Sequence, residues 1–510
     1  MWFLKALLIV IAVAAVAIVV ARSIFVLPEV EGRTDSTTLP PPDTGPLAEM
    51  LDDRGEPGLT GIAPLQSGAE AFAARIILAD AAVSSIDAQY YIWHDDLTGT
   101  LLLDALLRAA DRGVRVRLML DDNGTSGLDA EMAQLNAHEN IEVRLYNPFN
   151  LRGTFKMLSY GFDFFRLNRR MHNKSFIVDG LATVVGGRNV GDEYFGTGPT
   201  ALYVDLDVMA VGRIVPEIAA DFDRYWASPS VLPVGPLLDP ANGDPVGEGL
   251  ERLREDEQLT EYRDILRRSD IVQSIANGDL PLEWTRAILF SDDPKKGQGA
   301  VPREDLLASR LTKAVGTIEQ GFDGVSPYFV PTKSGVRAFG TLQTAGIPVW
   351  MLTNSLEATD VLPVHAGYAK HRKAMLREGV TIYELRRQAA PAAPDDVGIF
   401  GSSGSSLHAK TFAVDTSRIF VGSFNFDPRS TMLNTEMGLL IDSETMARGL
   451  NKVFDSELDG LAWRVELRDG KDLVWVDPTD GSVTEEEPGS TTLRRLALTV
   501  IGWLPVEWLL

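Results

Sequence analysis

The chain has 510 residues, 45% hydrophobic and 23% charged, which is enough for two domains with substantial cores. Its net charge of -23 excludes general nucleic-acid binding, because that function needs a basic surface to displace counterions. The lack of cysteine excludes disulfides, cysteine-ligated zinc and thiol catalysis.

Residues 1–27 carry Lys5 near their start, are apolar from there to Ala21, and end in a second apolar patch after Arg22. This pattern predicts a single membrane-spanning anchor. A cleaved signal peptide is the alternative, but no small-x-small cleavage site follows Arg22, so a retained anchor (or uncleaved signal) is favoured. Lys5 before the run, and acidic residues after it, favour a body that faces outward. Residues 28–60 are rich in Pro, Asp, Thr and Gly, which predicts an extended linker.

The first domain is predicted over residues 61–235. Helical and strand patterns alternate over 68–82, 85–93, 101–112 and 114–120, which indicates a mainly parallel sheet with helices on both faces. Acidic clusters follow the two strands, at residues 94–96 and 121–123. Loop carboxylates in such places more often cap the next helix, so no metal site is expected.

The segment "FKMLSYGFDFFRLNRR" (155–170) combines five aromatic residues with basic flanks. One interpretation is a helix packed on the sheet. The other is an amphipathic element that contacts acyl chains while its basic residues meet lipid phosphates.

One motif then appears twice in the chain. It consists of His, Lys, Asp and a Gly-rich element ending in Asn, at the same spacing: His172, Lys174, Asp179, Gly186-Gly187-Arg188-Asn189, and His408, Lys410, Asp415, Gly422-Ser423-Phe424-Asn425. The flanking apolar residues predict a strand, a turn and a second strand. Residues two apart share one strand face, so each His points with its Lys. A single copy could arise by chance, but two copies among only six His make chance a poor explanation.

Two such surfaces facing each other would surround one phosphate. Lys174, Lys410, Asn189, Asn425 and Ser423 supply cations and donors for its oxygens. One His can attack phosphorus, and the other can act as general acid and then as base. The motif pair therefore predicts phosphoryl chemistry without a metal.

The two halves are a duplication. The motif histidines lie 236 residues apart, and "AQYYIW" (88–93) matches "VSPYFV" (325–330) at an offset of 237. Between the halves, residues 236–282 are strongly charged and predict a solvated linker helix. The second domain is predicted over 283–485 and includes a Pro-, Ala-, Gly- and Ser-rich loop from Ala389 to Ser406, which either gates the site or merely connects. Residues 490–510, with Arg494-Arg495 and two Trp, predict a membrane-interfacial segment, with a buried terminal helix as the alternative.

The doubled motif resembles the HxKxxxxD signature of the phospholipase D superfamily. Further segments resemble its bacterial cardiolipin synthase branch, particularly the type C members: "RMHNKSFIVDG", "VVGGRNVGDEYF", "SPYFVP", "TNSLEATDVLPVHAGYAKHR" and "VGSFNFDPRSTMLNTEMGLL". One departure is Gly187, where many members, like Ser423 in the second copy, carry Ser. The resemblance implies two fused α/β/α sandwich domains related by a pseudo-two-fold axis, with one active site between them.

The resemblance also implies roles for other residues. An acidic residue, Glu436, would orient a catalytic His through its second ring nitrogen, and Asp207 is the expected counterpart in the first half. Asp179 and Asp415 belong to the catalytic signature, although their place on the strand favours a structural role at the domain interface. A substrate pocket is expected from Tyr328, Asn354, His365 and Tyr368, with helix capping as the alternative for Asn354.

The function implied is that of a phosphatidyltransferase in the bacterial inner membrane, with no cofactor. His172 would attack the phosphorus of a phospholipid, and His408 would protonate the leaving headgroup and then activate phosphatidylglycerol, which gives cardiolipin. Phosphatidylglycerol, and in addition phosphatidylethanolamine, are the expected lipid substrates. The alternative is a phospholipase D or phosphodiesterase that uses water as acceptor. A catalytically idle membrane scaffold would predict altered motif residues, and both motifs are complete.

Overall fold

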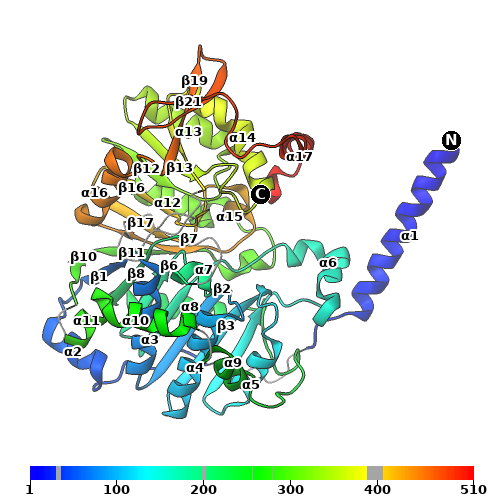
Figure 1. The fold of residues 1–510 in the computed structure, drawn as a ribbon. Coiled ribbons are helices and arrows are strands. Elements are labelled where there is room, and N and C mark those ends of the chain that lie inside the picture. Colours follow the sequence, from blue (N-terminus) through cyan, green and yellow to red (C-terminus); the bar gives the residue numbers. More distant parts are fainter. Residues whose placement is uncertain (30–35, 198–202, 255–256, 278–279, 388–405) are drawn as a thin grey trace.

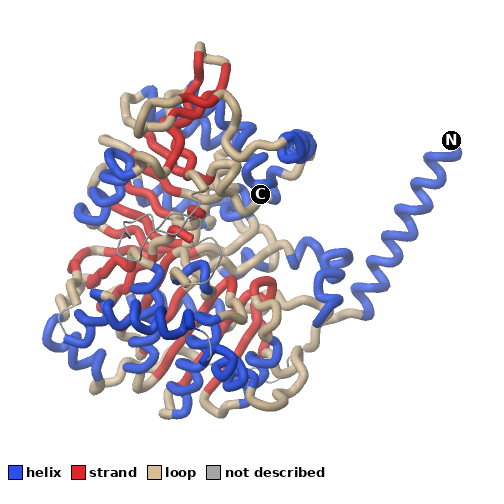
Figure 2. The backbone as a smooth tube through the Cα atoms, in the orientation of Figure 1, coloured by secondary structure: helices blue, strands red, loops and turns tan. Residues whose placement is uncertain are grey.

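The structure is a computed structural model that describes residues 1–29, 36–197, 203–254, 257–277, 280–387 and 406–510. Two α/β domains stack on each other, and one long helix projects to the side (Figures 1 and 2). The loop from Ala389 to Ser406, predicted either to gate the site or merely to connect, lies outside the described residues apart from Ser406.

Domain 1 is built on a nine-stranded sheet in the order β10-β1-β8-β6-β5-β2-β3-β4-β9. Its strands are β1 (Thr60–Leu65), β2 (Ser85–Ile92), β3 (Arg115–Gly124), β4 (Ile141–Tyr146), β5 (Ser175–Val178), β6 (Ala182–Gly186), β8 (Asp207–Gly212), β9 (Val231–Pro233) and β10 (Glu283–Thr285). Among these described strands, the parallel pairs are β2–β3 and β3–β4. The prediction of a mainly parallel sheet is therefore wrong, because the hairpin β5–β6 and the strands beyond it add antiparallel pairs.

Domain 2 repeats this plan in a ten-stranded sheet, in the order β11-β18-β17-β16-β12-β13-β14-β19-β20-β21. Its strands are β11 (Ala287–Ser291), β12 (Phe322–Val325), β13 (Val349–Asn354), β14 (Thr381–Leu385), β16 (Thr411–Val414), β17 (Arg418–Gly422), β18 (Met437–Ile441), β19 (Ala462–Arg468), β20 (Asp472–Val476) and β21 (Val483–Thr484). Its three-strand parallel unit is β12-β13-β14, which corresponds to β2-β3-β4.

Helices pack on both faces of the domain 1 sheet, since Phe72 and Leu102 belong to one buried cluster and Phe222 belongs to another. Ser67 and Glu70 form a capping box at the start of α3, and Asp96 accepts a hydrogen bond from the Gly99 N–H at the start of α4. The helices of the two domains are α3 (Gly68–Ala81), α4 (Leu97–Asp111), α5 (Asp129–Ala137), α6 (Tyr160–Leu167), α7 (Asp192–Phe195), α8 (Val215–Trp226), α12 (Leu307–Val315), α13 (Thr332–Thr344), α14 (Leu362–Arg377), α15 (Pro428–Met432) and α16 (Glu444–Lys452).

The predicted solvated linker helix is instead three helices, α9 (Pro245–Arg254), α10 (Glu257–Arg268) and α11 (Asp270–Asn277), which pack on α3 and α4 of domain 1. Leu259 and Tyr262 are three residues apart, so they share one helix face and are buried together with Ile271. Charged residues surround these apolar positions in the sequence, and for that reason the sequence pattern predicts a solvated helix. Strand β10 also joins β1, so the sheet of domain 2 begins only after Thr285.

The segment before the first domain is not an extended linker where the structure describes it. It includes α2 (Pro46–Arg54), in which Leu47 and Ala48 are buried. The Thr38 N–H donates to Asp223 at 2.9 Å, and Arg117 donates to the Ser36 carbonyl at 2.7 Å. These contacts tie the segment to domain 1.

The two domains share an apolar core and two short backbone pairings. Ile177 and Val185 of domain 1 lie in one buried cluster with Leu352 and Val421 of domain 2. Across the same interface, β7 (Tyr203–Val204) pairs with β15 (Ser406–Leu407), and Met171 forms a bridge with Thr435. These pairings join the chain just before each motif His to the opposite domain.

Three exposed apolar elements lie on one side of the molecule, at the right in Figure 1. They are α1 (Trp2–Ile24), the η1–α6 segment (Gly153–Leu167) and α17 (Thr492–Trp503). Within the part of the chain that the structure describes, α1 is the one helix long and apolar enough to cross a membrane. Phe155 and Phe165 are 64% and 70% exposed, whereas Phe162 and Leu167 are buried, so the segment packs on the body through one side only and leaves other aromatic residues exposed. Helix α17 has no buried residue, which contradicts a buried terminal helix.

Candidate active site

Each motif His is held at the domain interface by its own backbone. His172 directly precedes the Asn173-Lys174 link to β5, and its N–H donates to the Thr435 carbonyl at 2.8 Å. His408 precedes β16 in the same way, and its N–H donates to the Val204 carbonyl at 2.8 Å. Both imidazoles are buried, at 5% and 6% exposure. The two halves thus place their histidines in matching positions across the interface.

Each His then bonds a carboxylate from the opposite domain. His172 Nδ1 lies 2.8 Å from Glu436 Oε2, and His408 Nδ1 lies 2.5 Å from Asp205 Oδ2. A carboxylate at this position accepts the Nδ1–H, so it fixes the tautomer that leaves the Nε2 lone pair available. The site is therefore made by both halves, and neither domain carries a complete His–carboxylate pair.

The expectation that Asp207 is the counterpart of Glu436 is wrong. Asp207 Oδ2 instead lies 2.8 Å from the buried Arg75 guanidinium. The strand register gives the reason: Gly186 pairs with Asp207, and Gly422 pairs with Gly438. Glu436 stands two residues before Gly438, so its equivalent stands two residues before Asp207 and is Asp205.

The two motif lysines are buried beside their histidines. Lys174 Nζ donates to the His172 carbonyl at 2.7 Å, and Lys410 Nζ lies 2.9 Å from His408 Nδ1. Burial and the neighbouring Lys410 charge lower the pKa of Lys174 to about 7. Burial lowers the pKa of Lys410 to about 8. Glu436 and Asp205 partly offset the two ammonium charges, and the N–H groups that are not used on the His172 and His408 carbonyls can donate to an anion held between the two lysines.

The histidines are neutral at pH 7. Burial lowers the pKa of His172 to about 4 against the opposing effect of Glu436, and Lys174 and Lys410 add to the lowering. Burial and Lys410 lower the pKa of His408 to about 3, against the opposing effect of Asp205, and Lys174 of domain 1 contributes as well. Because the charges of each domain act on the His of the other, the two motifs share one electrostatic site. A neutral imidazole with a free Nε2 is the form required of a nucleophile or general base.

The two asparagines of the motifs, Asn189 and Asn425, are both buried. Asn189 Oδ1 accepts the Ile92 N–H at 3.2 Å, while its buried Nδ2 has no hydrogen-bond partner among the described residues. Ser423 donates its hydroxyl to Glu436 at 2.6 Å. The Asn189 amide is therefore available to a phosphate oxygen, whereas the Ser423 hydroxyl is already used to hold Glu436. Asn425 Oδ1 is likewise buried without a partner among these residues.

Gly187 has a steric reason to differ from Ser423. A Cβ added at Gly187 would lie 2.1 Å from Asp205 Oδ1, whereas the second copy has room for Ser423 beside the longer Glu436. We expect Gly187→Ser to displace Asp205 and to lower turnover about 100-fold, because small misplacements of catalytic groups have effects of this size. Steady-state lipid-transfer rates measure this. Gly161→Ala is the control, since its Cβ would meet no atom within 4 Å, and equal rates for both variants would contradict the prediction.

Asp179 and Asp415 do not lie on the interface. Asp179 accepts hydrogen bonds from the N–H groups of Val83, Ser84 and Ser85, and Asp415 accepts from Glu319, Gln320 and Gly321. Each holds the turn that leads into the neighbouring strand of its own domain. A structural role is thus supported, but within each domain and not between the two.

The predicted substrate pocket is dispersed. Asn354 bonds the backbone of Leu407, just before His408, through both ends of its amide. His365 Nε2 lies 2.9 Å from Glu487, and Tyr368 donates to Glu384 at 2.8 Å. These three residues use their polar groups inside domain 2, which argues against direct substrate contacts.

Tyr328 is linked to the site through the carboxylate of Asp360. It donates to Asp360 at 2.8 Å, and Tyr203, whose ring centre lies 5.0 Å from that of His408, reaches the same carboxylate. Tyr203 was missed by the sequence reasoning. So were Tyr91 and Tyr194, whose ring centres lie 5.1 Å from those of His172 and His408. Their aromatic character alone does not distinguish them from core residues.

Away from the histidine pair, His94, Asp96 and Glu193 place ligand atoms within 4.8 Å of one another. Asp96 caps α4, as the sequence indicated for this loop, and His94 Nδ1 lies 3.2 Å from Glu193. These three side chains therefore already contact partners within domain 1.

The lysine pKa values predict that anion binding weakens as pH rises. Free Lys174 and Lys410 lose protons near pH 7 and 8, and a bound anion favours their charged forms, so above pH 7 the complex holds more protons than the free protein. The dissociation constant of sulfate, whose charge is constant over this range, should be flat below about pH 6 and rise by up to about tenfold per pH unit for each lysine above it. Calorimetry in buffers of different ionisation enthalpy counts these protons. Lys174→Met should remove one of them, and an affinity independent of pH between 6 and 9 would contradict the prediction.

Known proteins match the two-domain arrangement of the chain. A family model described as "Cardiolipin synthase, PLD-like domain" matches residues 76–226 and 310–458, one copy in each domain. The chain is 47% identical over 463 residues to cardiolipin synthase C of Escherichia coli strain K12, covering 89% of this chain and 97% of that protein. This chain belongs to the cardiolipin synthase family of the phospholipase D superfamily. As a family member it is an enzyme, a phosphatidyltransferase of phospholipid biosynthesis.

More distant relatives of this cardiolipin synthase family member were also found. Cardiolipin synthase A of Pseudomonas entomophila strain L48 is 26% identical over 412 residues, covering 80% of this chain and 70% of that protein. Among solved structures, phosphatidylserine synthase of Haemophilus influenzae Rd KW20 matches with a TM-score of 0.53 at 16% identity, covering 80% of this chain and 89% of that chain. This last match shows a common fold.

Proposed function

We propose that this protein makes cardiolipin by transferring a phosphatidyl group to phosphatidylglycerol through a phosphohistidine intermediate. The observation that carries the proposal is the crossed pair of contacts, His172 with Glu436 and His408 with Asp205, which prepares one imidazole from each domain. The homologous cardiolipin synthases support phosphatidyl transfer as the reaction class.

In the first step, Nε2 of His172 attacks the phosphorus of a phospholipid. The P–O bond to the headgroup alcohol breaks, and the leaving oxygen takes a proton from Nε2 of His408. Free His408 is neutral, because its pKa is about 3. The bound diester places a negative charge beside the ring, which raises that pKa and allows it to carry the proton. Lys174, Lys410 and the Asn189 amide neutralise the equatorial oxygens.

In the second step, a hydroxyl of phosphatidylglycerol attacks the phosphohistidine. Nε2 of His408 removes the proton of that hydroxyl, the P–N bond to His172 breaks, and the new P–O bond completes cardiolipin. Asp205, which contacts His408 Nδ1, stabilises the imidazolium that forms, as a buried carboxylate does for other catalytic histidines. Burial raises the pKa of Asp205, but the imidazolium that forms at His408, the hydrogen bond from that ring and the Lys410 charge outweigh burial and keep this pKa below its usual range, so Asp205 stays ionised.

The test is an assay of the purified protein in mixed micelles with phosphatidylglycerol alone and with added phosphatidylethanolamine. With phosphatidylglycerol alone we expect cardiolipin and free glycerol. With added phosphatidylethanolamine we expect ethanolamine among the released headgroups if that lipid also donates. Absence of cardiolipin in both cases would contradict the synthase proposal. Phosphatidic acid as the main product would instead identify the hydrolytic alternative, with water as acceptor.

We further propose that α1 anchors the protein in the bacterial inner membrane with its body facing the periplasm. Helix α1 has 23 residues, about 35 Å of helix, which exceeds the ~30 Å core of a bilayer. Lys5 near its start and the acidic residues after it support the outward orientation. Protease added to spheroplasts should digest the body, and full protection of the body would contradict this orientation.

A further inference from the structure

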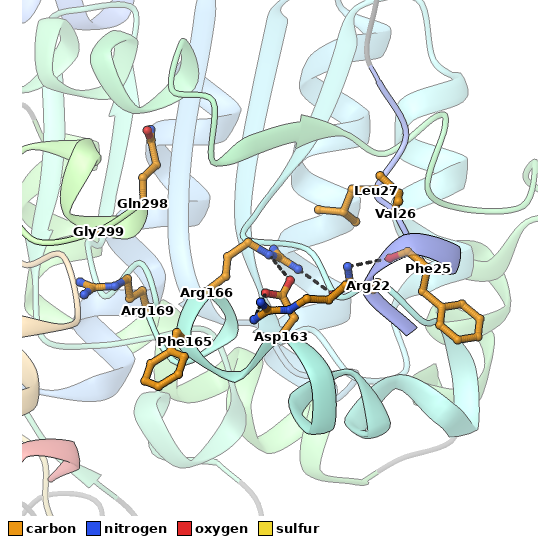
Figure 3. Close-up of a pocket in the computed structure, with 11 residues that line it drawn as sticks. Arg22, Phe25, Val26, Leu27, Asp163, Phe165, Arg166, Arg169, Gln298 and Gly299 are labelled. Carbon is orange, nitrogen blue, oxygen red and sulfur yellow. Dashed lines mark hydrogen bonds and ion pairs between the residues drawn. The ribbon is translucent and has the colours of Figure 1, made fainter. Parts of the chain in front are cut away.

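A second site lies at the base of the anchor helix. A pocket of about 630 Å³ opens between the end of α1, helix α6 and the loop that carries Gln298 and Gly299 of domain 2 (Figure 3). Arg22, Arg166 and Arg169 line it together with one acidic residue, Asp163. None of these residues belongs to the two His-Lys motifs.

The pocket carries an excess of positive charge in a chain whose net charge is -23. Asp163 lies 2.6 Å from Arg166 Nε and 3.9 Å from Arg22 Nη2, so one carboxylate serves two guanidinium groups. Arg169 donates to the carbonyl oxygens of Lys296 and Met432 and has no carboxylate partner among the described residues. Among the described residues, three guanidinium groups of this pocket thus share one carboxylate. Burial lowers the pKa of Arg166 and of Arg169, which shows that both are partly desolvated.

The pocket also lies where an apolar surface meets a polar one. Phe155, Met157, Leu158 and Phe165 of the η1–α6 segment are between 61% and 70% exposed. Phe25, just after α1, stacks on Phe162 with ring centres 5.7 Å apart, and Arg22 donates to the Phe162 carbonyl at 2.6 Å. These contacts fix the pocket at the end of the anchor, which is the depth of lipid headgroups if α1 crosses the bilayer.

We propose that this pocket binds the phosphodiester headgroup of an anionic phospholipid, as a site separate from the one that holds His172 and His408. Arginine suits this ligand, because its planar fork pairs two N–H groups with two phosphate oxygens. The exposed aromatic and aliphatic side chains beside the pocket would contact the acyl chains of the same lipid. Arg169 also touches the backbone of domain 2, so a bound lipid would connect the anchor, domain 1 and domain 2. The inference rests on the proposed membrane attachment through α1 and not on the transfer reaction.

Native mass spectrometry of the full chain in detergent can count bound lipids. His172→Ala/His408→Ala serves as the background, so that lipid is not consumed, and dioleoyl phosphatidylglycerol is compared with dioleoyl phosphatidylcholine. Arg169→Gln in this background should bind one phosphatidylglycerol fewer, with affinity reduced about tenfold to a hundredfold, while phosphatidylcholine binding stays unchanged. Arg169→Lys should recover part of the loss, which damage to the fold would not allow.

Arg495→Gln is the matched control, because Arg495 lies on α17, on the same side of the molecule but outside the pocket. An equal loss in Arg495→Gln, or no loss in Arg169→Gln, would overturn the proposal in favour of diffuse surface electrostatics. Glycerol 3-phosphate and inorganic phosphate test the source of the phosphate. Displacement of the lipid by either at a similar concentration would overturn a lipid site.

The transfer assay distinguishes this proposal from the proposed function. If the wild-type protein makes no cardiolipin but Arg169→Gln still loses one lipid, the pocket stands and the synthase proposal fails. If cardiolipin is made and the lipid count does not change in Arg169→Gln, the pocket proposal fails alone.

Discussion

His172→Ala and His408→Ala should each abolish cardiolipin formation, but they should stop the reaction at different steps. Loss of the nucleophile removes the phosphoenzyme altogether, whereas loss of a general acid or base alone costs about 10²- to 10⁴-fold. With a donor whose leaving group is a nitrophenol and needs no proton, His408→Ala should still release one equivalent of nitrophenol and accumulate phosphohistidine. His172→Ala should release none. Rapid quench with labelled donor measures both.

His138→Ala is the control for these variants, because His138 contacts Asp111 on the surface of domain 1. It should transfer at the wild-type rate. The opposite pattern, with phosphoenzyme in His172→Ala and none in His408→Ala, would exchange the proposed roles. Full activity in either single variant would contradict a mechanism that needs both histidines.

Asp205→Asn and Asp207→Asn should have different effects although the two residues are separated by one position. Asp205 faces His408, and an amide there no longer favours the tautomer with Nε2 unprotonated, so kcat should fall about 10²- to 10⁴-fold with little change in KM. Asp207 instead compensates the buried Arg75. Its replacement leaves that charge unpaired and should lower the free energy of unfolding by about 3–5 kcal/mol.

Denaturant unfolding and steady-state kinetics on both variants separate the two roles. Glu436→Gln should reproduce the kinetic effect of Asp205→Asn, since Glu436 is the equivalent partner of His172. If Asp207→Asn instead had the large kinetic effect and normal stability, the assignment of Asp205 to His408 would be wrong.

The difference between Asp205 and Asp207 depends on strand register, which the sequence alone does not specify. Asp207 begins strand β8 and Asp205 stands two residues before it. The pairing of Gly186 with Asp207 identifies Asp205 as the equivalent of Glu436 and so as the partner of His408. Sequence patterns place strand ends only to within a few residues, and a shift of two residues is inside that range. Aligning the two halves on Gly186 and Gly422 would have found Asp205 only if the position of both strands had been known.

The prediction of a substrate pocket finds no support from the contacts of its residues, for a related reason. Asn354, His365 and Tyr368 follow a strand at the edge where α/β proteins bind ligands, so their place in the chain suggested a pocket. In the structure their polar groups bond Leu407, Glu487 and Glu384. Buried polar side chains must find partners, and those partners come from segments far away in the chain.

Local and repeated features can be derived from the residues alone: two His-x-Lys motifs on strand hairpins, a duplication, and an apolar helix at the start. These follow from residue spacing and strand periodicity, which depend on near neighbours. Two further features emerge from the folded chain: each His takes its carboxylate from the other half of the chain, and α9, α10 and α11 cover domain 1. Such contacts depend on how two sheets stack across their common apolar core, and no short stretch of sequence encodes contacts between residues so far apart in the chain.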